Sequence, residues 1–270
     1  MPTLTAAPTP TVRTTSFAYP DDFALAWSGS VPEFAYAANS VSLMMPYLEP
    51  YIARSVRAAR VHLADTALRD QADAYVRQEL SHHAQHRRFN LLVAERCRGT
   101  HTLERLMQRM FAYLGQRRRL GTHLAFAVGA EAFAYAAARW AAEHRRELLA
   151  TADPEIAALF VWHLAEEVEH KTVAFDVFYA VDGSRRRLAW GLLQSFSILA
   201  LFALIGTTLQ LIRGRRLLHP VAVVRLVRWT LTFLFELLPA MAVTLLPGHH
   251  PRDLADPAYL VQWLHEYDAA

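Results

Sequence analysis

Apolar residues recur every three to four positions along most of this chain, which is the period of an amphipathic α-helix. The pattern predicts long helices over residues 31–63, 67–98, 120–149 and 154–181, and a shorter one over 102–114. The composition agrees, because the chain is rich in Ala, Leu, Arg and Val and has only ten Gly. The predicted fold class is therefore all-α.

Residues that start, break or end helices support these boundaries. Pro46 and Pro50 would kink the first helix or break it into two pieces. Gly99 would close the second helix. Asp153 followed by Pro154 is a typical start for the fourth, and Asp182-Gly183 would end it.

The last third of the chain changes character. No residue from 188 to 212 is charged, and a second apolar stretch from 229 to 246 contains a single charged residue, Glu236. The first run is long enough to span a bilayer, but arginines flank it on both sides, at 185–187 and 213–216, which disfavours a simple crossing. We expect a hydrophobic helical hairpin that dips into one leaflet. The alternative is two buried helices, packed over the bundle or at a dimer interface, because polar residues dilute the run: Gln194, Ser195, Thr207, Thr208 and Gln210.

Length, charge and cysteine content exclude several classes of protein. At 270 residues with 53% hydrophobic residues, the chain can bury a sizeable core. The net charge is only +3, and no aromatic residues interleave the arginine clusters, so we expect no nucleic-acid partner. The single cysteine, Cys97, rules out an internal disulfide framework and a thiolate metal site. The N-terminal segment is rich in Pro and Thr and lacks the pattern of a secretory signal, so we expect a disordered tail.

Two predicted helices carry Glu and His at the spacing i, i+3, i+4, i+7, which places all four side chains on one face. These are His163, Glu166, Glu167 and His170 in one helix, and Glu79, His82, His83 and His86 in the other. Each set contains one Glu-x-x-His. The spacing is weak evidence by itself, since about one match is expected by chance in a chain with this many Glu and His.

The first and third helices each carry a single Glu in apolar surroundings, Glu49 and Glu131. A carboxylate buried alone costs several kcal/mol, so each must be exposed, protonated, paired or bound to metal. Glu49 could point to solvent at the proline kink, whereas exposure is the least expected state for Glu131. The order along the chain, Glu, Glu-x-x-His, Glu, Glu-x-x-His, is that of the ferritin-like dimetal-carboxylate bundle. Such hard donors suit iron or manganese better than zinc.

Two longer motifs carry a resemblance to known families. They are Q-E-x-x-H-x-x-x-H-x-x-x-N at residues 78–90 and W-H-x-x-E-E-x-E-H-K at 162–171. Through them, residues 43–181 resemble the bacterial family of predicted metal-dependent hydrolases. The ligand order also resembles the di-iron arylamine N-oxygenases, whose last helix has His-x-x-x-Glu-x-x-His. That second resemblance implies His163 as an additional ligand, but it does not extend beyond the ligands, so the substrates of those enzymes do not transfer.

The predicted site consists of seven metal ligands, with three further residues nearby. The ligands are Glu49, Glu79, His82, Glu131, His163, Glu167 and His170. His86 is expected to support a ligand or to be a further ligand. Glu166 is expected to hold a ligand His or to pair with Arg, and His83 is as readily a partly buried surface residue. We expect two iron ions, with manganese as the second choice and zinc as the third.

The predicted organisation has four parts: a disordered tail over 1–30, a dimetal four-helix bundle over 31–183, a hydrophobic helical appendage over 184–248, and a C-terminal tail over 249–270. The expected location is the cytoplasm, at the inner face of the cell membrane. A membrane surface is the expected partner, and a homodimer remains open.

The favoured function is an O₂-dependent di-iron oxidoreductase that acts on a small apolar, acyl or lipid-like substrate and requires an electron donor. The first alternative is a dimetal-dependent hydrolase of an ester, amide or phosphoester. The second is a non-catalytic, metal-binding, membrane-associated protein. Oxygenase and hydrolase use the same ligands, so the sequence does not separate them.

Overall fold

The computed structural model describes residues 8–116 and 119–269, and over these ranges it confirms the all-α class. The described part contains no β-strand, only an isolated bridge between Ser28 and Ala152. Short 3₁₀ turns occur at Arg60–His62 and Pro251–Asp253. The α-helices are α1 Pro32–Ser42, α2 Met45–Ala59, α3 Thr66–Arg96, α4 Thr100–Leu114, α5 Leu120–Leu148, α6 Pro154–His170, α7 Val173–Val181, α8 Arg185–Arg213, α9 Pro220–Val243 and α10 Ala258–Ala269.

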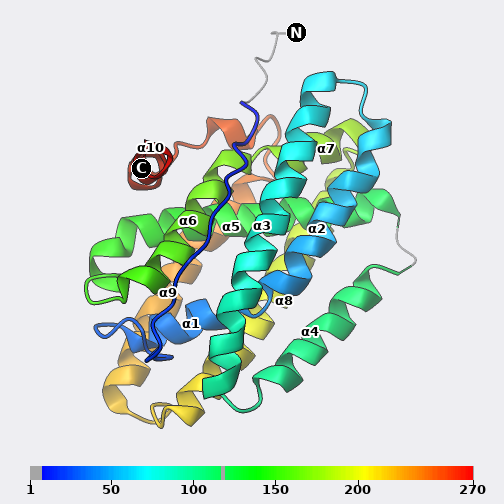
Figure 1. Ribbon diagram of the computed structural model, residues 1–270. Helices are drawn as coiled ribbons and strands as arrows, with labels where there is room; N and C mark the ends of the chain where they lie inside the picture. Colours follow the sequence, from blue (N-terminus) through cyan, green and yellow to red (C-terminus); the bar gives the residue numbers. More distant parts are fainter. Residues whose placement is uncertain (1–7, 117–118, 270) are drawn as a thin grey trace.

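Four helices, α2, α3, α5 and α6, surround the centre of the molecule (Figure 1). Local signals set where two of them begin. Asp65 caps α3 by accepting the Ala67 amide, and Asp153 caps α6 by accepting the amides of Glu155 and Ile156. Both caps satisfy amide groups that the first turn of a helix leaves without a partner.

Two of the predicted helices are each divided. The range 31–63 forms α1 and α2, with the break at 43–44, just before Pro46 in the first turn of α2. Proline has no backbone N–H, so Pro46 cannot donate to the carbonyl of Ser42, four residues earlier, which explains an interruption of the helical hydrogen bonds at this point. The second proline, Pro50, lies inside α2 without ending it. The range 154–181 forms α6 and α7, which are separated at residues 171–172.

The expected disordered tail is wrong for residues 8–30, while residues 1–7 lie outside the described residues. Residues 8–30 run along the bundle, and Phe17, Phe23 and Trp27 are buried in the main core. Phe17 lies 5.5 Å from Trp162 of α6, centroid to centroid. Three buried aromatic side chains offset the entropy of ordering the segment, and the Pro- and Thr-rich composition did not reveal these contacts.

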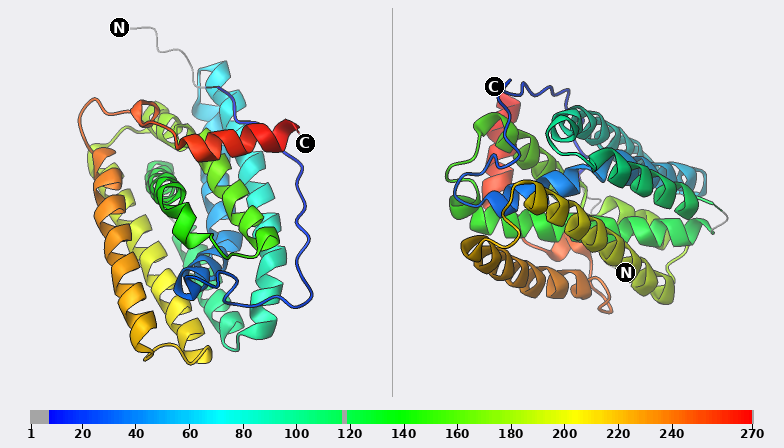
Figure 2. Two further views of the ribbon diagram at one scale, coloured as in Figure 1. Left: turned by 90° about the vertical axis from the view of Figure 1, so that its left-hand side faces the viewer. Right: turned by 90° about the horizontal axis from the view of Figure 1, so that it is seen from below.

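The C-terminal third lies on one flank of the bundle. α8 packs on α5 and α1, and α9 packs on α5 (Figure 2, left, yellow and orange). The approach of α8 to α5 is close, because a Cβ atom on Gly191 would lie 2.2 Å from the carbonyl oxygen of Ala125. Among the described helices, α8 alone is long and apolar enough to cross a membrane, and 33% of its apolar window is buried.

The end of the chain also covers the bundle. α10 crosses one end of the molecule, close to the extended N-terminal segment (Figure 2, left). Its Leu260 and Leu264 are buried in a small second core with α6.

The run of arginines at 117–119 falls mostly outside the described residues, since only Arg119 is described.

Candidate metal centre

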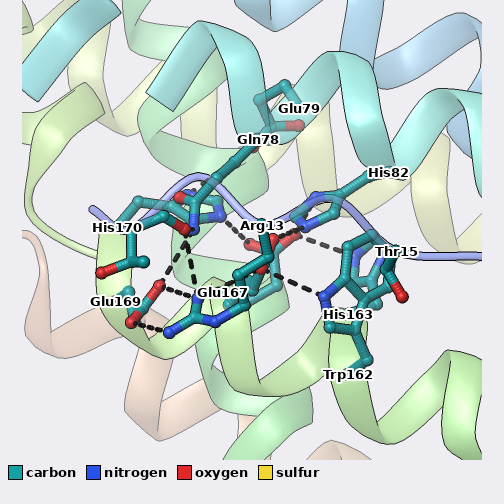
Figure 3. A network of polar contacts seen from close by, with 12 residues as sticks. Arg13, Thr15, Gln78, Glu79, His82, Trp162, His163, Glu167, Glu169 and His170 are labelled. Carbon is teal, nitrogen blue, oxygen red and sulfur yellow. Dashed lines mark hydrogen bonds and ion pairs between the residues drawn. The ribbon is translucent and has the colours of Figure 1, made fainter. Parts of the chain in front are cut away.

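The structure brings all seven predicted ligands into one buried cluster. They come from the four central helices, and none is more than 8% exposed. The donor atoms form two groups, and within each group they all lie within 4.8 Å of one another. The first group consists of Glu79, His82, Glu167 and His170, and the second of Glu49, His82 and His163. His82 belongs to both, so the groups adjoin, as the donors of a two-metal centre would (Figure 3).

Glu131, the remaining predicted ligand, contacts the first group directly. Its Oε2 lies 3.0 Å from Nδ1 of His170, and its Oε1 accepts a hydrogen bond of 2.7 Å from the Tyr75 hydroxyl. Glu167 lies between the groups, with Oε1 2.9 Å from Nε2 of His163 and Oε2 3.8 Å from Nε2 of His170. The carboxylates therefore alternate with imidazoles around one small volume.

Many of these donor atoms have no hydrogen-bond partner although they are buried. They are both carboxylate oxygens of Glu49 and of Glu79, Nδ1 of His82, Oε2 of Glu167 and Nε2 of His170. A buried polar atom without a partner costs about 1–3 kcal/mol, so such a concentration needs an explanation. Cations would satisfy all of these atoms at once, since each offers a lone pair. The residues present therefore fit a metal centre.

Burial and mutual repulsion shift the pKa values of the metal-free cluster. Burial, with repulsion from neighbouring carboxylates, raises the pKa of Glu49 and of Glu79 well above the ordinary value. Burial, with repulsion from neighbouring imidazoles, lowers the pKa of His82 well below its ordinary value. For His170, the burial effect is outweighed by Glu167 and Glu131, which raise its pKa to about 9. In the absence of cations, protons must therefore neutralise part of the negative charge.

His82 is oriented by Glu166, which lies outside the cluster of ligands. The Nε2 atom of His82 is 3.0 Å from Oε2 of Glu166. Because the pKa of His82 is lowered, its imidazole is neutral, and a proton on Nε2 leaves the lone pair on Nδ1 facing the cluster. This is the usual arrangement of a metal-binding histidine, in which one nitrogen binds and the other donates to a carboxylate.

Arg13 of the N-terminal segment holds Glu166 in turn. Its Nη1 donates to Glu166 at 3.1 Å and to Glu169 at 2.7 Å. Its Nε donates to Asp268 of α10 at 2.6 Å. One buried guanidinium thus ties the two ends of the described chain to the helix that carries three predicted ligands (Figure 3).

His86 does not join either donor group but supports His163. The Ser42 hydroxyl donates to Asn90 at 2.6 Å, so it must accept from Nδ1 of His86 at 2.8 Å. Nε2 of His86 then accepts from Nδ1 of His163 at 2.7 Å. This chain leaves a lone pair on Nε2 of His163, which faces the Glu167 carboxylate, so a proton or a cation must lie between them. His83 is half-buried and takes part in neither group.

Sequence reasoning missed Arg13, Asp268, Ser42 and Tyr75. Only Tyr75 had a local signal, since it lies four residues before Glu79 on the same face of α3. Arg13 and Asp268 lie in segments that were expected to be tails. Their roles depend on contacts across 153 and 255 residues of sequence, which no local pattern reports.

A hollow adjoins the cluster on the α5 side. Its walls include Val128, Glu131, Ala132, Lys171, Phe175 and Ala240, and its cavity volume is about 20 Å³. Glu131 is the only predicted ligand among its lining residues. The ammonium group of Lys171 donates to the carbonyl of Leu254 at 2.8 Å and pairs with Asp256. The hollow is thus mainly apolar and leads toward one edge of the cluster.

Comparison with known proteins gives one family. The family model described as predicted metal-dependent hydrolase matches residues 11–255, which includes the N-terminal segment, the cluster, α8 and α9. No curated protein and no solved structure matches the chain.

Proposed function

Because the chain belongs to the family of predicted metal-dependent hydrolases, we propose that it is a hydrolase with a two-metal centre at the buried Glu/His cluster. The observation that carries this proposal is the set of buried donor atoms without a hydrogen-bond partner in two adjoining groups. In a cluster that only stabilised the fold, ion pairs and hydrogen bonds would satisfy these donor atoms. Here the atoms lie without such partners in one small buried volume. In the proposed function, all of these atoms bind metal ions.

The seven predicted residues would hold the ions. Glu79, Glu131 and His170 would bind on one side, Glu49 and His163 on the other, with His82 and Glu167 between them. Divalent ions at such a site supply Lewis acidity toward a carbonyl or phosphoryl oxygen and lower the pKa of water.

The protein's own groups have three tasks in the reaction. Glu166 keeps His82 in the tautomer that presents Nδ1, and the chain from Asn90 through Ser42 and His86 orients His163. Tyr75 holds Glu131, and its raised pKa keeps the phenol protonated so that it remains a donor. The surrounding core excludes bulk water and so strengthens each of these interactions.

The hollow beside Glu131 supports an apolar substrate. Most of its lining is apolar, with Val128, Ala132, Phe175, Ala240, Pro251 and Leu254 among the lining residues. We therefore place the scissile bond of a small ester or amide with an apolar acyl part at this edge of the cluster. The narrow space favours an extended group over a bulky one.

Oxidation of an apolar substrate by a di-iron centre is the second candidate. The donor set favours it, because four hard carboxylate ligands combined with three imidazoles suit iron or manganese. Such a reaction would require O₂ and an electron donor. The family description favours hydrolysis, so oxidation stands second.

Metal content and metal substitution separate the two candidates. Purified protein should contain about two divalent transition-metal ions per chain, measured by elemental analysis. A hydrolase should cleave short acyl esters without O₂ and should retain activity when redox-inert zinc replaces iron. Oxygen uptake by the reduced iron protein, with no ester cleavage under any metal, would contradict hydrolysis and support oxidation. One metal ion per chain, or none after growth with ample metal, would contradict both.

A further inference from the structure

The outward face of α8 and α9 is apolar over the length of both helices. Exposed large side chains recur there at helical spacing, and they include Trp190 (57% exposed), Leu204 (63%), Val224 (68%) and Phe235 (76%). The two helices lie along one flank of the molecule (Figure 2). So many exposed large apolar side chains along two helices of one flank are unusual on a soluble monomer and mark an interaction site.

The buried side of α8 carries polar residues among its apolar ones. Its polar residues Ser195, Thr207 and Gln210 are buried against the bundle, and Gln210 bonds to Asn39, Tyr36 and Ser40 of α1. Large apolar side chains nevertheless also point outward: Trp190, Leu193, Leu201, Leu204 and Ile205 are exposed, whereas Leu188, Leu192, Leu199 and Leu211 are buried. A helix at a boundary with water is expected to expose polar residues, so this outward face suits contact with an apolar environment.

The charged residues within α9 all have partners on the bundle. Arg225 pairs with Glu33 at 3.8 Å, and Arg228 donates to Glu147 at 2.9 Å. Glu236 lies 3.1 Å from His144 of α5. These contacts pair the ionic groups of α9 with the protein, although the Arg228 and Glu236 side chains remain 59% and 38% exposed.

Basic residues lie at both ends of α8. Arg185 and Arg186 are exposed at its start, and Arg213 and Arg215 at its end. Among the described residues, no acidic side chain pairs with Arg186, Arg213 or Arg215. Arginines beside an apolar face complement anionic lipid headgroups, each contributing about 1 kcal/mol near such a surface.

We propose that this face binds the surface of a membrane that contains anionic lipids, with α8 and α9 lying in the interface and the bundle in water. The helices do not span the bilayer, since one side of each is packed on α5 and α9 carries ionic groups. A second copy of the chain fits less well. Both ends of α8 are basic, so pairing through a twofold axis places arginines of one copy opposite arginines of the other.

The test uses the full chain and vesicles of phosphatidylcholine, with and without phosphatidylglycerol. The protein should float with both kinds of vesicle, more tightly with the anionic kind, and should remain bound in ~1 M salt, where charge attraction is screened to about 3 Å. Phe235→Glu and Leu204→Glu should each weaken partition about tenfold or more, because each removes one large apolar side chain from the lipid. Arg186→Gln with Arg213→Gln should reduce the preference for anionic vesicles about fivefold per arginine without abolishing binding.

The matched control is Leu91→Glu on α3, which is 61% exposed and does not belong to this face. It should leave vesicle binding unchanged. Circular dichroism and melting curves identify any variant that fails to fold.

Three outcomes would overturn the proposal. They are a full chain that binds neither kind of vesicle, equal loss of binding in Leu91→Glu and Phe235→Glu, and a dimer in sedimentation that Phe235→Glu dissociates while vesicle binding is absent. The last outcome would assign the face to a second copy. None of these measurements depends on the metal centre, so the proposed hydrolase function can fail or hold separately.

Discussion

At the scale of single residues, the buried carboxylates differ from surface carboxylates in what their removal should do. Glu131 is 3% exposed and holds both Tyr75 and His170. Glu131→Ala removes one predicted ligand and leaves those two groups without a partner, so bound metal should fall by at least half in elemental analysis.

Glu143 on the same helix supplies the control. Its side chain is 56% exposed and makes only a long ion pair with Arg139, so Glu143→Ala should retain full metal content and lose less than about 0.5 kcal/mol of stability. Equal metal loss in both variants would mean that general destabilisation, and not ligation, accounts for the effect.

Glu166 tests the positioning of a ligand without removing one. Glu166→Ala should leave all seven predicted ligands in place but release Nε2 of His82, and it should weaken metal affinity about 10–100-fold in a competition titration. Glu155→Ala, at the exposed start of α6, should leave the affinity unchanged. An unaltered affinity in Glu166→Ala would contradict the positioning role.

At the scale of elements, the N-terminal segment depends on one buried cation. Arg13→Ala would leave Glu166, Glu169 and Asp268 without their shared partner, and its side chain is only 6% exposed. Unfolding in urea should show a loss of about 3 kcal/mol, as expected when one partner of a buried ion pair is removed.

Arg60 provides the comparison for Arg13. It makes a similar contact with Asp73, but both side chains are more than a third exposed, so Arg60→Ala should cost less than about 1 kcal/mol. If the two variants lose the same stability, the Arg13 cluster is not a clamp between the ends of the chain.

The contact between α5 and α8 depends on the absence of a side chain. An alanine Cβ at position 191 would lie 2.2 Å from a backbone oxygen, so the helices must separate, and Gly191→Ala should cost about 1–3 kcal/mol in thermal or chemical unfolding. Gly115→Ala is the control, because its Cβ would have ordinary contacts of 3.5 Å. Equal stability of both variants would show that α8 is not firmly packed on α5.

At the scale of the whole molecule, the proposed ions connect four helices that otherwise bring like charges together. Chelation should therefore lower the melting temperature. A metal present at a thousandfold excess over its Kd adds about 4 kcal/mol, which for a chain of this size corresponds to about 10 °C. Differential scanning calorimetry before chelation, after it and after metal is restored measures the change. An unchanged melting temperature on removal of bound metal would contradict ligation from several helices.

The sequence by itself determined the all-α class and the residues that form the cluster. Both follow from local rules: a period of 3.6 residues marks a helix, and a Glu or His on the apolar face of a helix must find a partner in the interior. Glu49 and Glu131 could be selected in this way because each is a single carboxylate in an apolar run. Helix boundaries were less well determined by the sequence, since the helix is interrupted before Pro46 but continues through Pro50.

Only the tertiary structure decided what surrounds the cluster and which way α8 faces. The contacts of Arg13 with Glu166 and Asp268 join residues more than 150 positions apart. They contribute to stability because the ion pairs are buried, and they become buried only when the two segments pack together. In α8, the sequence shows an apolar run diluted by a few polar residues, which fits a buried helix and a lipid-facing helix equally well. Thr207 and Gln210 face α1 because hydrogen-bonding groups there satisfy them, whereas lipid or an apolar core cannot, and Ser195 donates to Leu192 of its own helix. This packing sets which of the large apolar side chains of α8 remain outside.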